Sequence, residues 1–158
     1  MRKQHEANKI ELLSPAGDME SLKAAILYGA DAVYIGGGEF GLRVNAGFST
    51  EELTEAVEYA HKRNVKVYLT CNIVANNLDI DGFAEFIKSI PAVDAVIVSD
   101  LGVFDLVKTH APDLPVHIST QAGVMNYATA DMLCKLGAKR VILARETSFE
   151  DTKRIIFQ

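Results

Sequence analysis

Cysteine is scarce in this sequence, which has only Cys71 and Cys134 and lacks tryptophan among its 158 residues. The two cysteines do not form a CxxC pair, and no pair of histidines lies near either of them in the sequence. These are too few ligands for a zinc or iron-sulfur site built within one chain. We therefore expect no metal site in this chain, and we predict that both cysteines are buried thiols of the core.

A long apolar run is missing from the N-terminus, where residues 1–9 carry two early cations with no apolar run behind them. This pattern fits neither a signal peptide nor a membrane anchor, so a cytoplasmic protein is expected. An excess of positive charge is also missing, since the formal net charge is -5. The balance argues against a broad basic surface for nucleic acid, but it excludes neither RNA nor a small acid as a ligand.

The chain is otherwise rich in apolar residues, which make up 49% of it and suffice for one domain with a core. Short apolar runs alternate with amphipathic segments, without any linker or low-complexity stretch between them. Asp18, Ser49 and Ser148 are expected to cap helices, Ser49 in a capping box with Glu52, and Gly137 is expected to end one. The predicted strands span 10–13, 32–35, 65–73, 95–99, 116–120 and 141–144, and the predicted helices span 18–28, 49–64, 80–90, 101–110, 127–136 and 148–156.

Six strand-helix pairs in a row predict an α/β fold with a parallel sheet and right-handed crossovers. Both a doubly wound sheet and a (β/α) barrel of the TIM type fit this order. Polar residues near the strand ends favour the barrel, because its lumen accepts side chains that an open sheet would bury beneath helices. These residues are Thr70, Asn72, Asp100, His117, Ser119 and Gln121.

A closed barrel needs eight units and roughly 250 residues, so this chain is two units short. We predict an N-terminal tail at 1–9 and a partial barrel domain at 10–158. The first and sixth strands would then be exposed edges, which predicts self-association or poor solubility of the isolated chain.

A polar loop follows the second strand, at the end where parallel α/β folds place their chemistry. Glycines 36–38 allow a tight turn or a close approach to a ligand, and Arg43 and Asn45 come just after them. Arg43 could bind a carboxylate or phosphate, or form an ion pair with Glu11 or Glu39; Asn45 could orient a substrate or cap its own loop. Gly36, Gly38 and Gly41 also match GxGxxG, but a dinucleotide site needs a helix opening on these glycines, and the next helix is expected only at Ser49.

Five segments resemble peptidase family U32, the collagenase-like proteases, in the order and at the spacing of that family. The resemblance covers about residues 10–146. Its segments read Glu-Leu-Leu-Ser-Pro-Ala-Gly-Asp at 11–18, Gly-Ala-Asp-Ala-Val-Tyr-Ile-Gly-Gly at 29–37, Phe-Gly-Leu-Arg-Val-Asn-Ala at 40–46, Ser-Thr-Gln at 119–121 and Ala-Arg-Glu at 144–146.

This resemblance implies a barrel fold and oxygen-independent hydroxylation. Branches of the family hydroxylate wobble uridine in tRNA with prephenate, modify ribosomal RNA, or serve ubiquinone synthesis. Their four-iron, four-sulfur [4Fe-4S] cluster is held by cysteines that lie shortly after the segment matched by Arg145 and Glu146. Because this chain ends at Gln158, the resemblance supplies no cluster ligand and no catalytic residue here.

Further candidates for substrate binding lie at the ends of later strands. Asn72 shares the lumen face of its strand with Thr70, whereas Cys71 faces the helices. Asp100 could act as a base or anion partner, but an N-cap role is slightly favoured. Arg145 and Glu146 either bind substrate or pair with neighbours around the rim.

Ser119 and Gln121 are expected on one side of the fifth strand, with His117 deeper on that side. A catalytic triad of Ser119, His117 and Asp100 is rejected, because residues two apart on one strand stand parallel and Ser119 is not on a nucleophile elbow. Gln121 is expected to contact the substrate by a hydrogen bond.

The sequence thus predicts the substrate-pocket portion of a protein that hydroxylates tRNA or a related substrate, with RNA contacted through the full-length protein. The expected ligand is a small anionic co-substrate such as prephenate, whose two carboxylates suit arginine. Two alternatives are a collagenase-like peptidase and a non-catalytic remnant or binding module.

Overall fold

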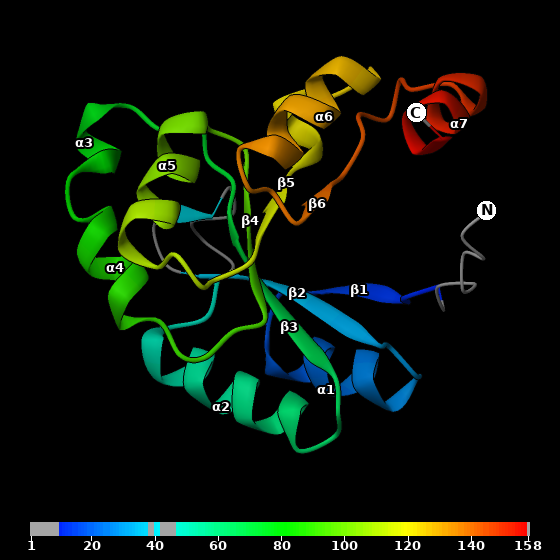
Figure 1. Cartoon of the computed structure of the whole chain (residues 1–158). Helices are drawn as coiled ribbons and strands as arrows, with labels where there is room; N and C mark the ends of the chain where they lie inside the picture. The colour runs from blue at the N-terminus through cyan, green and yellow to red at the C-terminus, as the bar shows by residue number, and fades with distance from the viewer. Residues whose placement is uncertain (1–9, 38–39, 42–46, 158) are drawn as a thin grey trace.

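The computed structural model describes residues 10–37, 40–41 and 47–157 and contains six strands that alternate with helices (Figure 1). The strands are β1 (Leu13–Ala16), β2 (Ala32–Gly36), β3 (Lys66–Cys71), β4 (Ala95–Val98), β5 (Val116–Ile118) and β6 (Arg140–Val141). The α-helices are α1 (Met19–Leu27), α2 (Thr50–His61), α3 (Asn77–Ile80), α4 (Phe83–Ser89), α5 (Leu101–His110), α6 (Tyr127–Lys135) and α7 (Phe149–Phe157).

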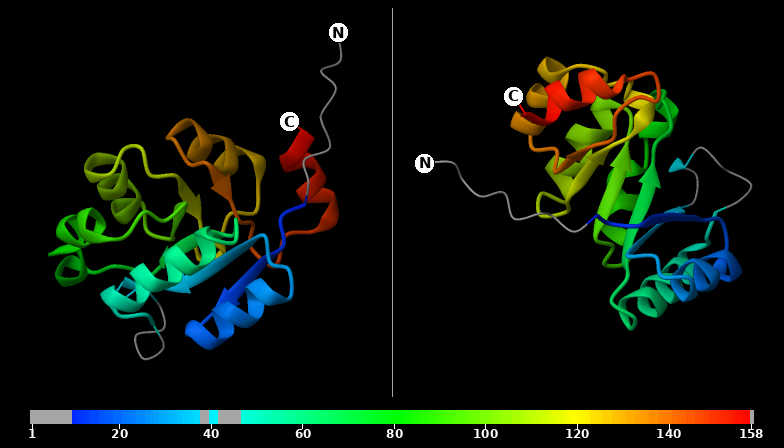
Figure 2. Two further views of the ribbon diagram at one scale, coloured as in Figure 1. Left: turned by 90° about the horizontal axis from the view of Figure 1, so that it is seen from below. Right: turned by 90° about the vertical axis from the view of Figure 1, so that its right-hand side faces the viewer.

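All six strands are parallel and follow their sequence order in one sheet, so β1 and β6 are its two edges. The helices surround the outside of the curved sheet (Figure 2). Val67, Leu69 and Cys71 of β3 point into the core beneath the helices, whereas Tyr68 belongs to a smaller apolar cluster on the inner face. This one-sided cover identifies the α/β fold as part of a TIM-type barrel, and the doubly wound alternative is wrong.

The predicted helix signals are confirmed at the starts of three helices and at the end of a fourth. Asp18 caps α1, and Ser49 and Glu52 form the capping box of α2. Ser148 receives hydrogen bonds from the first turn of α7, and Gly137 follows α6 with a φ of 106°. That φ is left-handed, which suits a glycine just after a helix end.

The first strand lies further along the chain than predicted. Ile10 is 91% exposed, and β1 begins only at Leu13. Apolar residues at 10–13 therefore do not mark the strand. Pro15 lies within β1, which is an edge strand, where a missing N–H is tolerated.

The third helical segment is split rather than continuous. Asn76 caps the short helix α3 with its own capping box, and Gly82 then adopts a left-handed φ of 89° before α4. The prediction of one helix over 80–90 is therefore wrong. The apolar residues keep a helical spacing through this segment, and that spacing reveals neither the cap at Asn76 nor the break at Gly82.

Cys134 corrects the prediction that both cysteines are buried. Cys71 is buried, as expected, but Cys134 is exposed on α6. The helix turns Ala130 and Leu133 toward the core, and the residue after Leu133 therefore faces outward.

None of the helices in the described ranges is long and apolar enough to cross a membrane.

Candidate functional site

A cavity of about 410 Å³ opens at the carboxyl ends of the strands. Its base is apolar and its upper wall is polar, and no acidic residue lies among the described residues that line it. The base consists of Leu13, Tyr34, Ile97 and Ile142; the wall and rim consist of Pro15, Ala16, Gly17, Gly36, Thr70, Asn72, Ser119, Thr120, Gln121 and Arg145.

Strand β3 places its polar residues as the period-two pattern predicts. Thr70 and Asn72 line the cavity, and Cys71 between them lies in the helix-side core. The hydroxyl proton of Thr70 is already used, because it is donated to the backbone oxygen of Ile35 at 3.1 Å. The side chain of Asn72 makes no hydrogen bond within the described residues, so its amide is available to a ligand.

Ser119 and Gln121 both reach the cavity, but not as neighbours on one strand. Strand β5 ends at Ile118, and residues 120–122 form a short 3-10 helix. The prediction that β5 extends to residue 120 is wrong, because the Ser119 hydroxyl accepts the N–H of Gln121 at 3.3 Å and turns the chain. The turn carries Gln121 to the rim.

Arg145 and Glu146 lie in a turn after β6, beyond the end of the predicted strand. Arg145 lines the cavity, whereas exposed Glu146 does not. Within the described residues, Arg145 makes no hydrogen bond or ion pair. Its guanidinium therefore offers five N–H donors to an anion at the cavity mouth.

Asp100 lies apart from the cavity and caps α5, as favoured from the sequence. Its carboxylate accepts the N–H groups of Gly102 at 2.7 Å and Val103 at 3.0 Å. His117 Nδ1 has no hydrogen-bond partner among the described residues. The described contacts therefore do not join Ser119, His117 and Asp100 into a triad.

Arg43 and Asn45 lie outside the described residues, so their predicted roles remain predictions. At nearby Gly37, the space for a side chain is limited by the core and not by a ligand. A Cβ on Gly37 would lie 2.6 Å from Leu69 Cδ1, which leaves no room for a larger residue there.

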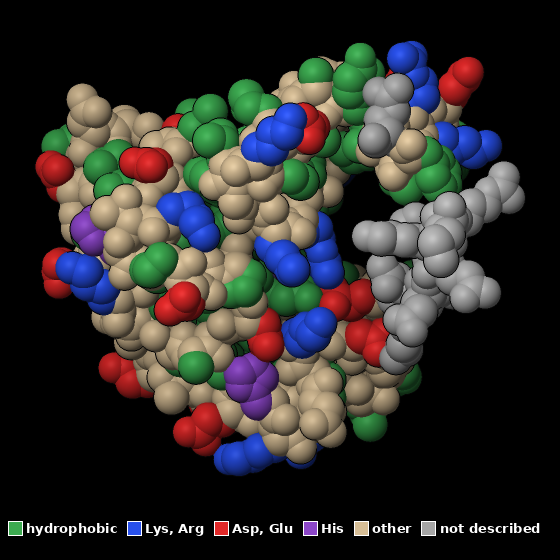
Figure 3. Space-filling model, viewed as in Figure 1, with side chains coloured by type: hydrophobic (Ala, Val, Ile, Leu, Met, Phe, Trp, Pro, Cys, Tyr) green, Lys and Arg blue, Asp and Glu red, His purple; other side chains and the backbone are tan. Residues whose placement is uncertain are grey.

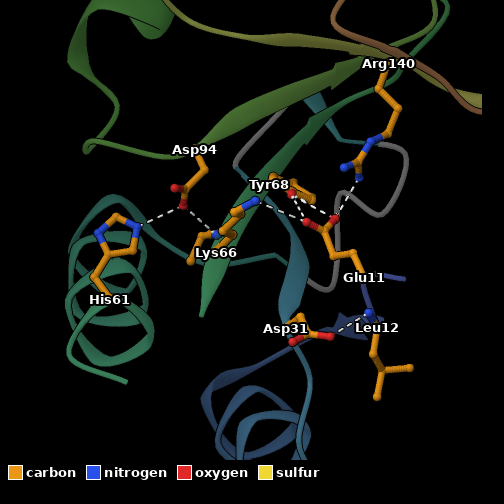
Figure 4. A network of polar contacts seen from close by, with 9 residues as sticks. Glu11, Leu12, Asp31, His61, Lys66, Tyr68, Asp94 and Arg140 are labelled. Atoms are coloured by element: carbon orange, nitrogen blue, oxygen red, sulfur yellow. Dashed lines mark hydrogen bonds and ion pairs between the residues drawn. The ribbon is translucent and has the colours of Figure 1, made fainter. Parts of the chain in front are cut away.

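A second polar group, which we call the basal cluster, consists of Glu11, Lys66, Tyr68 and Arg140 at the opposite ends of the strands (Figure 4). Glu11 accepts hydrogen bonds from Arg140 at 2.8 Å, from Tyr68 at 2.9 Å and from Lys66 at 3.3 Å. In the space-filling view, cationic and acidic side chains lie side by side near the middle of the face shown (Figure 3).

The basal cluster shifts the titration of its own members. Burial alone would raise the pKa of Glu11, but the three donors outweigh it and lower that pKa from 4.5 to about 2. Burial, and then the adjacent Glu11 carboxylate, raises the pKa of Tyr68 to about 12. The carboxylate therefore stays ionised, and the phenol stays a donor, over the whole physiological range.

His117 lies beside this cluster, with its ring centroid 4.8 Å from that of Tyr68 in an edge-on arrangement. The residue is only 4% exposed. Burial first, and the charge of Arg140 second, lowers the pKa of His117 from 6.5 to about 4. It is therefore a neutral core histidine at physiological pH.

The cysteines of this chain do not fit an iron-sulfur cluster. Cys71 is completely buried, and burial raises the pKa of its thiol to about 12, whereas a ligand must be a thiolate. Cys134 lies on a different element, on the exposed side of α6. Across the described ranges, no group of three or more His, Cys, Asp or Glu residues is arranged to hold a metal ion.

Sequence reasoning missed two contributors to these sites. Tyr34 lines the cavity and packs in the inner-face cluster, and Glu11 joins three strands through its carboxylate. Period-two alternation along β2 would have placed Tyr34 on the lumen side with Ala32 and Gly36. No local signal reveals the partners of Glu11, because Arg140 is 129 residues away.

Comparison with known proteins relates this chain to one family. The sequence model of peptidase family U32 matches residues 17–158. The chain is 46% identical over 143 residues to tRNA hydroxylation protein P1 of Bacillus subtilis, covering 89% of this chain and 34% of that protein. It is 36% identical over 151 residues to the 23S rRNA 5-hydroxycytidine synthase of Escherichia coli, covering 94% and 23%.

A third relative, from Methanocaldococcus jannaschii, is called an uncharacterized protease and is 48% identical over 149 residues, covering 92% of this chain and 36% of the relative. The chain thus spans about a third or less of these curated relatives.

Among solved structures, the chain resembles a U32 peptidase with a TM-score of 0.77 at 17% identity, covering 99% of this chain and 68% of that one. It also resembles DHDPS from Cyanidioschyzon merolae with a TM-score of 0.59 at 17% identity, covering 92% and 59%. At such identities these two structures bear on the fold alone.

Proposed function

Because this chain belongs to peptidase family U32, we propose that it forms the substrate-pocket portion of a protein that hydroxylates tRNA, or a related RNA, without molecular oxygen. Two similarities support this function: relatives named for tRNA hydroxylation and for synthesis of 5-hydroxycytidine in 23S rRNA share 46% and 36% of their matched residues with this chain. The whole reaction belongs to the complete protein. Any [4Fe-4S] cluster of that protein would be held by cysteines outside this chain.

The single observation that carries the proposal is the cavity at the carboxyl ends of the strands. TIM-type barrels bind their substrates at this end. Among its described lining residues, the cavity presents unused hydrogen-bonding groups on Asn72, Gln121 and Arg145, and it presents no acid. This combination favours a small anion over a cation.

The apolar base adds a requirement for shape. Leu13, Tyr34, Ile97 and Ile142 form a lining that suits a carbon ring, while Arg145 at the rim suits a carboxylate. Prephenate has an unsaturated ring and two carboxylates. We propose it as the co-substrate, with Arg43 and Asn45 as further ligands.

The RNA would be contacted mainly through the rest of the protein. The net charge of this chain is -5, which is unfavourable for holding a polyanion by itself. The site of action would be the cytoplasm, where tRNA is modified.

The test is a binding and complementation experiment on the complete protein. Arg145→Ala and, separately, Arg43→Ala should weaken prephenate binding about tenfold or more in calorimetry, as expected for loss of a charged hydrogen bond. Both should lower 5-hydroxyuridine in tRNA of a complemented deletion strain. Arg63→Ala is a matched control, because Arg63 stacks 3.7 Å above the Tyr59 ring on the outer helix α2. Unchanged prephenate binding in both Arg145→Ala and Arg43→Ala would contradict the proposal.

A peptidase remains the second candidate, and the 48% identical relative called a protease favours it. This reading requires cleavage of peptide bonds by the purified complete protein, under air and in the presence of an iron chelator. A hydroxylase predicts instead a brown, oxygen-sensitive protein whose deletion removes hydroxylated nucleosides. The two outcomes exclude one another in a single preparation.

Self-association through the edges of β1 and β6 is a further part of the proposal. An edge strand presents unpaired N–H and C=O groups to any similar strand. Light scattering of the isolated chain over a range of concentrations tests it. A monomer at every concentration would refute this contact.

A further inference from the structure

Glu11 connects the two edges of an open sheet. The carboxylate precedes β1, and its partner Arg140 is the first residue of β6. These two strands are not neighbours, since four strands separate them in the sheet. Tyr68 of the central strand β3 donates to the same carboxylate from between them (Figure 4). The contact therefore spans the inner face of the sheet.

The same strands form the walls of the cavity at their other ends. Residues 15–17, at and after the end of β1, line one side, and Arg145, five residues after Arg140, lines the other. Thr70 and Asn72 of β3 line the wall between them. Each of the three strands joined at Glu11 thus also delivers lining residues to the cavity.

We propose that Glu11 is a positioning residue that sets the width of the cavity by fixing the separation of β1 and β6 from the opposite end of the sheet. The effect of Glu11 on ligand binding rests on the proposed function, whereas its effect on the separation of the strands does not. Glu11 itself is not among the described residues that line the cavity.

The chemistry of the contact suits a fixed spacer. Glu11 is 19% exposed at its side chain, and its low pKa, about 2, keeps the carboxylate charged at every physiological pH. Arg140 donates at 2.8 Å, and charge-assisted bonds of this length are short and directional. Lys66 is more exposed, at 55%, and more distant, at 3.3 Å, so it contributes less.

Distance measurement between spin labels tests the geometry directly. Labels are placed at exposed positions on α1, which packs on β1, and on α6, which packs on β6, by Glu20→Cys and Ala128→Cys with Cys134→Ser. Glu11→Gln should lengthen or broaden the label distance and weaken prephenate binding about tenfold, a loss of roughly 1.4 kcal/mol. Glu58→Gln is the control, because it removes an equally simple ion pair, to Lys62, that lies exposed on α2.

Chemical rescue separates positioning from general loss of stability. Glu11→Ala leaves the donors of Arg140 and Tyr68 without an acceptor, and added acetate supplies a carboxylate to the same place. Acetate should restore the label distance in Glu11→Ala, whereas sodium chloride at equal ionic strength should not. If Glu11→Ala does not fold, Arg140→Lys, which keeps the charge but shortens the reach, gives the same label readout.

A label distance unchanged in Glu11→Gln overturns the proposal, whether or not ligand binding falls. Failure of acetate to restore the distance in Glu11→Ala also overturns it. If the unaltered protein does not bind prephenate, the proposed co-substrate fails, and the label distances alone decide the role of Glu11.

Discussion

Asp94 accepts the backbone N–H of Val67 at 2.8 Å, and so fixes the start of β3 from the residue that precedes β4. The same carboxylate oxygen lies 2.9 Å from Nε2 of His61 at the end of α2. Asp31, which precedes β2, accepts the N–H of Leu12 at 2.9 Å in the same way. Each of the two aspartates begins an Asp-Ala-Val sequence, at 31–33 and at 94–96. The acids that precede β2 and β4 therefore each hold the preceding strand in register.

Asp94→Ala should destabilise the chain by about 1–2 kcal/mol, because the N–H of buried Val67 would lose an ionised acceptor. Urea unfolding monitored by circular dichroism measures the effect. Asp131→Asn is the control, since Asp131 pairs with Lys135 on the exposed side of α6, where an ion pair contributes about 0.5 kcal/mol or less. Equal midpoints for Asp94→Ala and the unaltered chain would contradict a register role.

Stability should fall between pH 6.5 and pH 4 because His117 is buried in its neutral form. Its folded-state pKa, about 4, lies below the unfolded value of 6.5. The unfolded chain therefore binds the proton first, and the contribution of His117 is full above pH 6.5 and lost as the pH falls toward 4. The loss should amount to about 1–3 kcal/mol.

Urea midpoints measured from pH 7.5 to pH 4 reveal this dependence. His117→Gln removes the titrating ring and should flatten the curve across this window, even if it lowers stability at every pH. The control is His110→Gln, at the last position of α5. A slope that persists unchanged in His117→Gln would assign the proton uptake to another group.

Gly37→Ala should destabilise the fold by about 1–3 kcal/mol through overpacking. The new methyl would lie 2.6 Å from Leu69 Cδ1, and Leu69 is fully buried beneath the helices, so it has little space to move. Gly17→Ala is a matched control, because nothing lies within 4 Å of a Cβ there. Thermal unfolding of the two variants side by side gives the comparison, and similar melting temperatures would refute the close approach.

The order of elements could be read from the sequence because each unit carries its own local signals. Ser49 with Glu52, Asp100 and Gly137 each mark a helix end through contacts a few residues away, and all three predictions are confirmed. The face on which each side chain of β3 lies could also be predicted, since alternation is a local property of a strand.

The boundaries that were predicted wrongly are those of strands whose ends are set by contacts with other parts of the chain. Strand β1 exists only where β2 offers partners, from Leu13 to Ala16, and the apolar character of Ile10 does not reflect pairing. Strand β5 ends early because the Ser119 side chain competes for a backbone N–H. The Glu11 contact has no local signal at all, because its carboxylate receives donors from two strands far away in the sequence, Lys66 and Tyr68 of β3 and Arg140 of β6.

The two cysteines should differ sharply in reactivity, which tests the orientation of α6 and β3 together. Cys134 is exposed and should react with a water-soluble disulfide reagent in the folded chain, giving one titratable thiol per molecule. Cys71 is completely buried, and burial raises its pKa to about 12, so almost no thiolate is present near neutral pH. It should react only after the chain unfolds in denaturant. Cys134→Ser should remove the fast reaction and leave the slow one, whereas rapid modification of Cys71 in that variant would show that the packing beneath the helices is wrong.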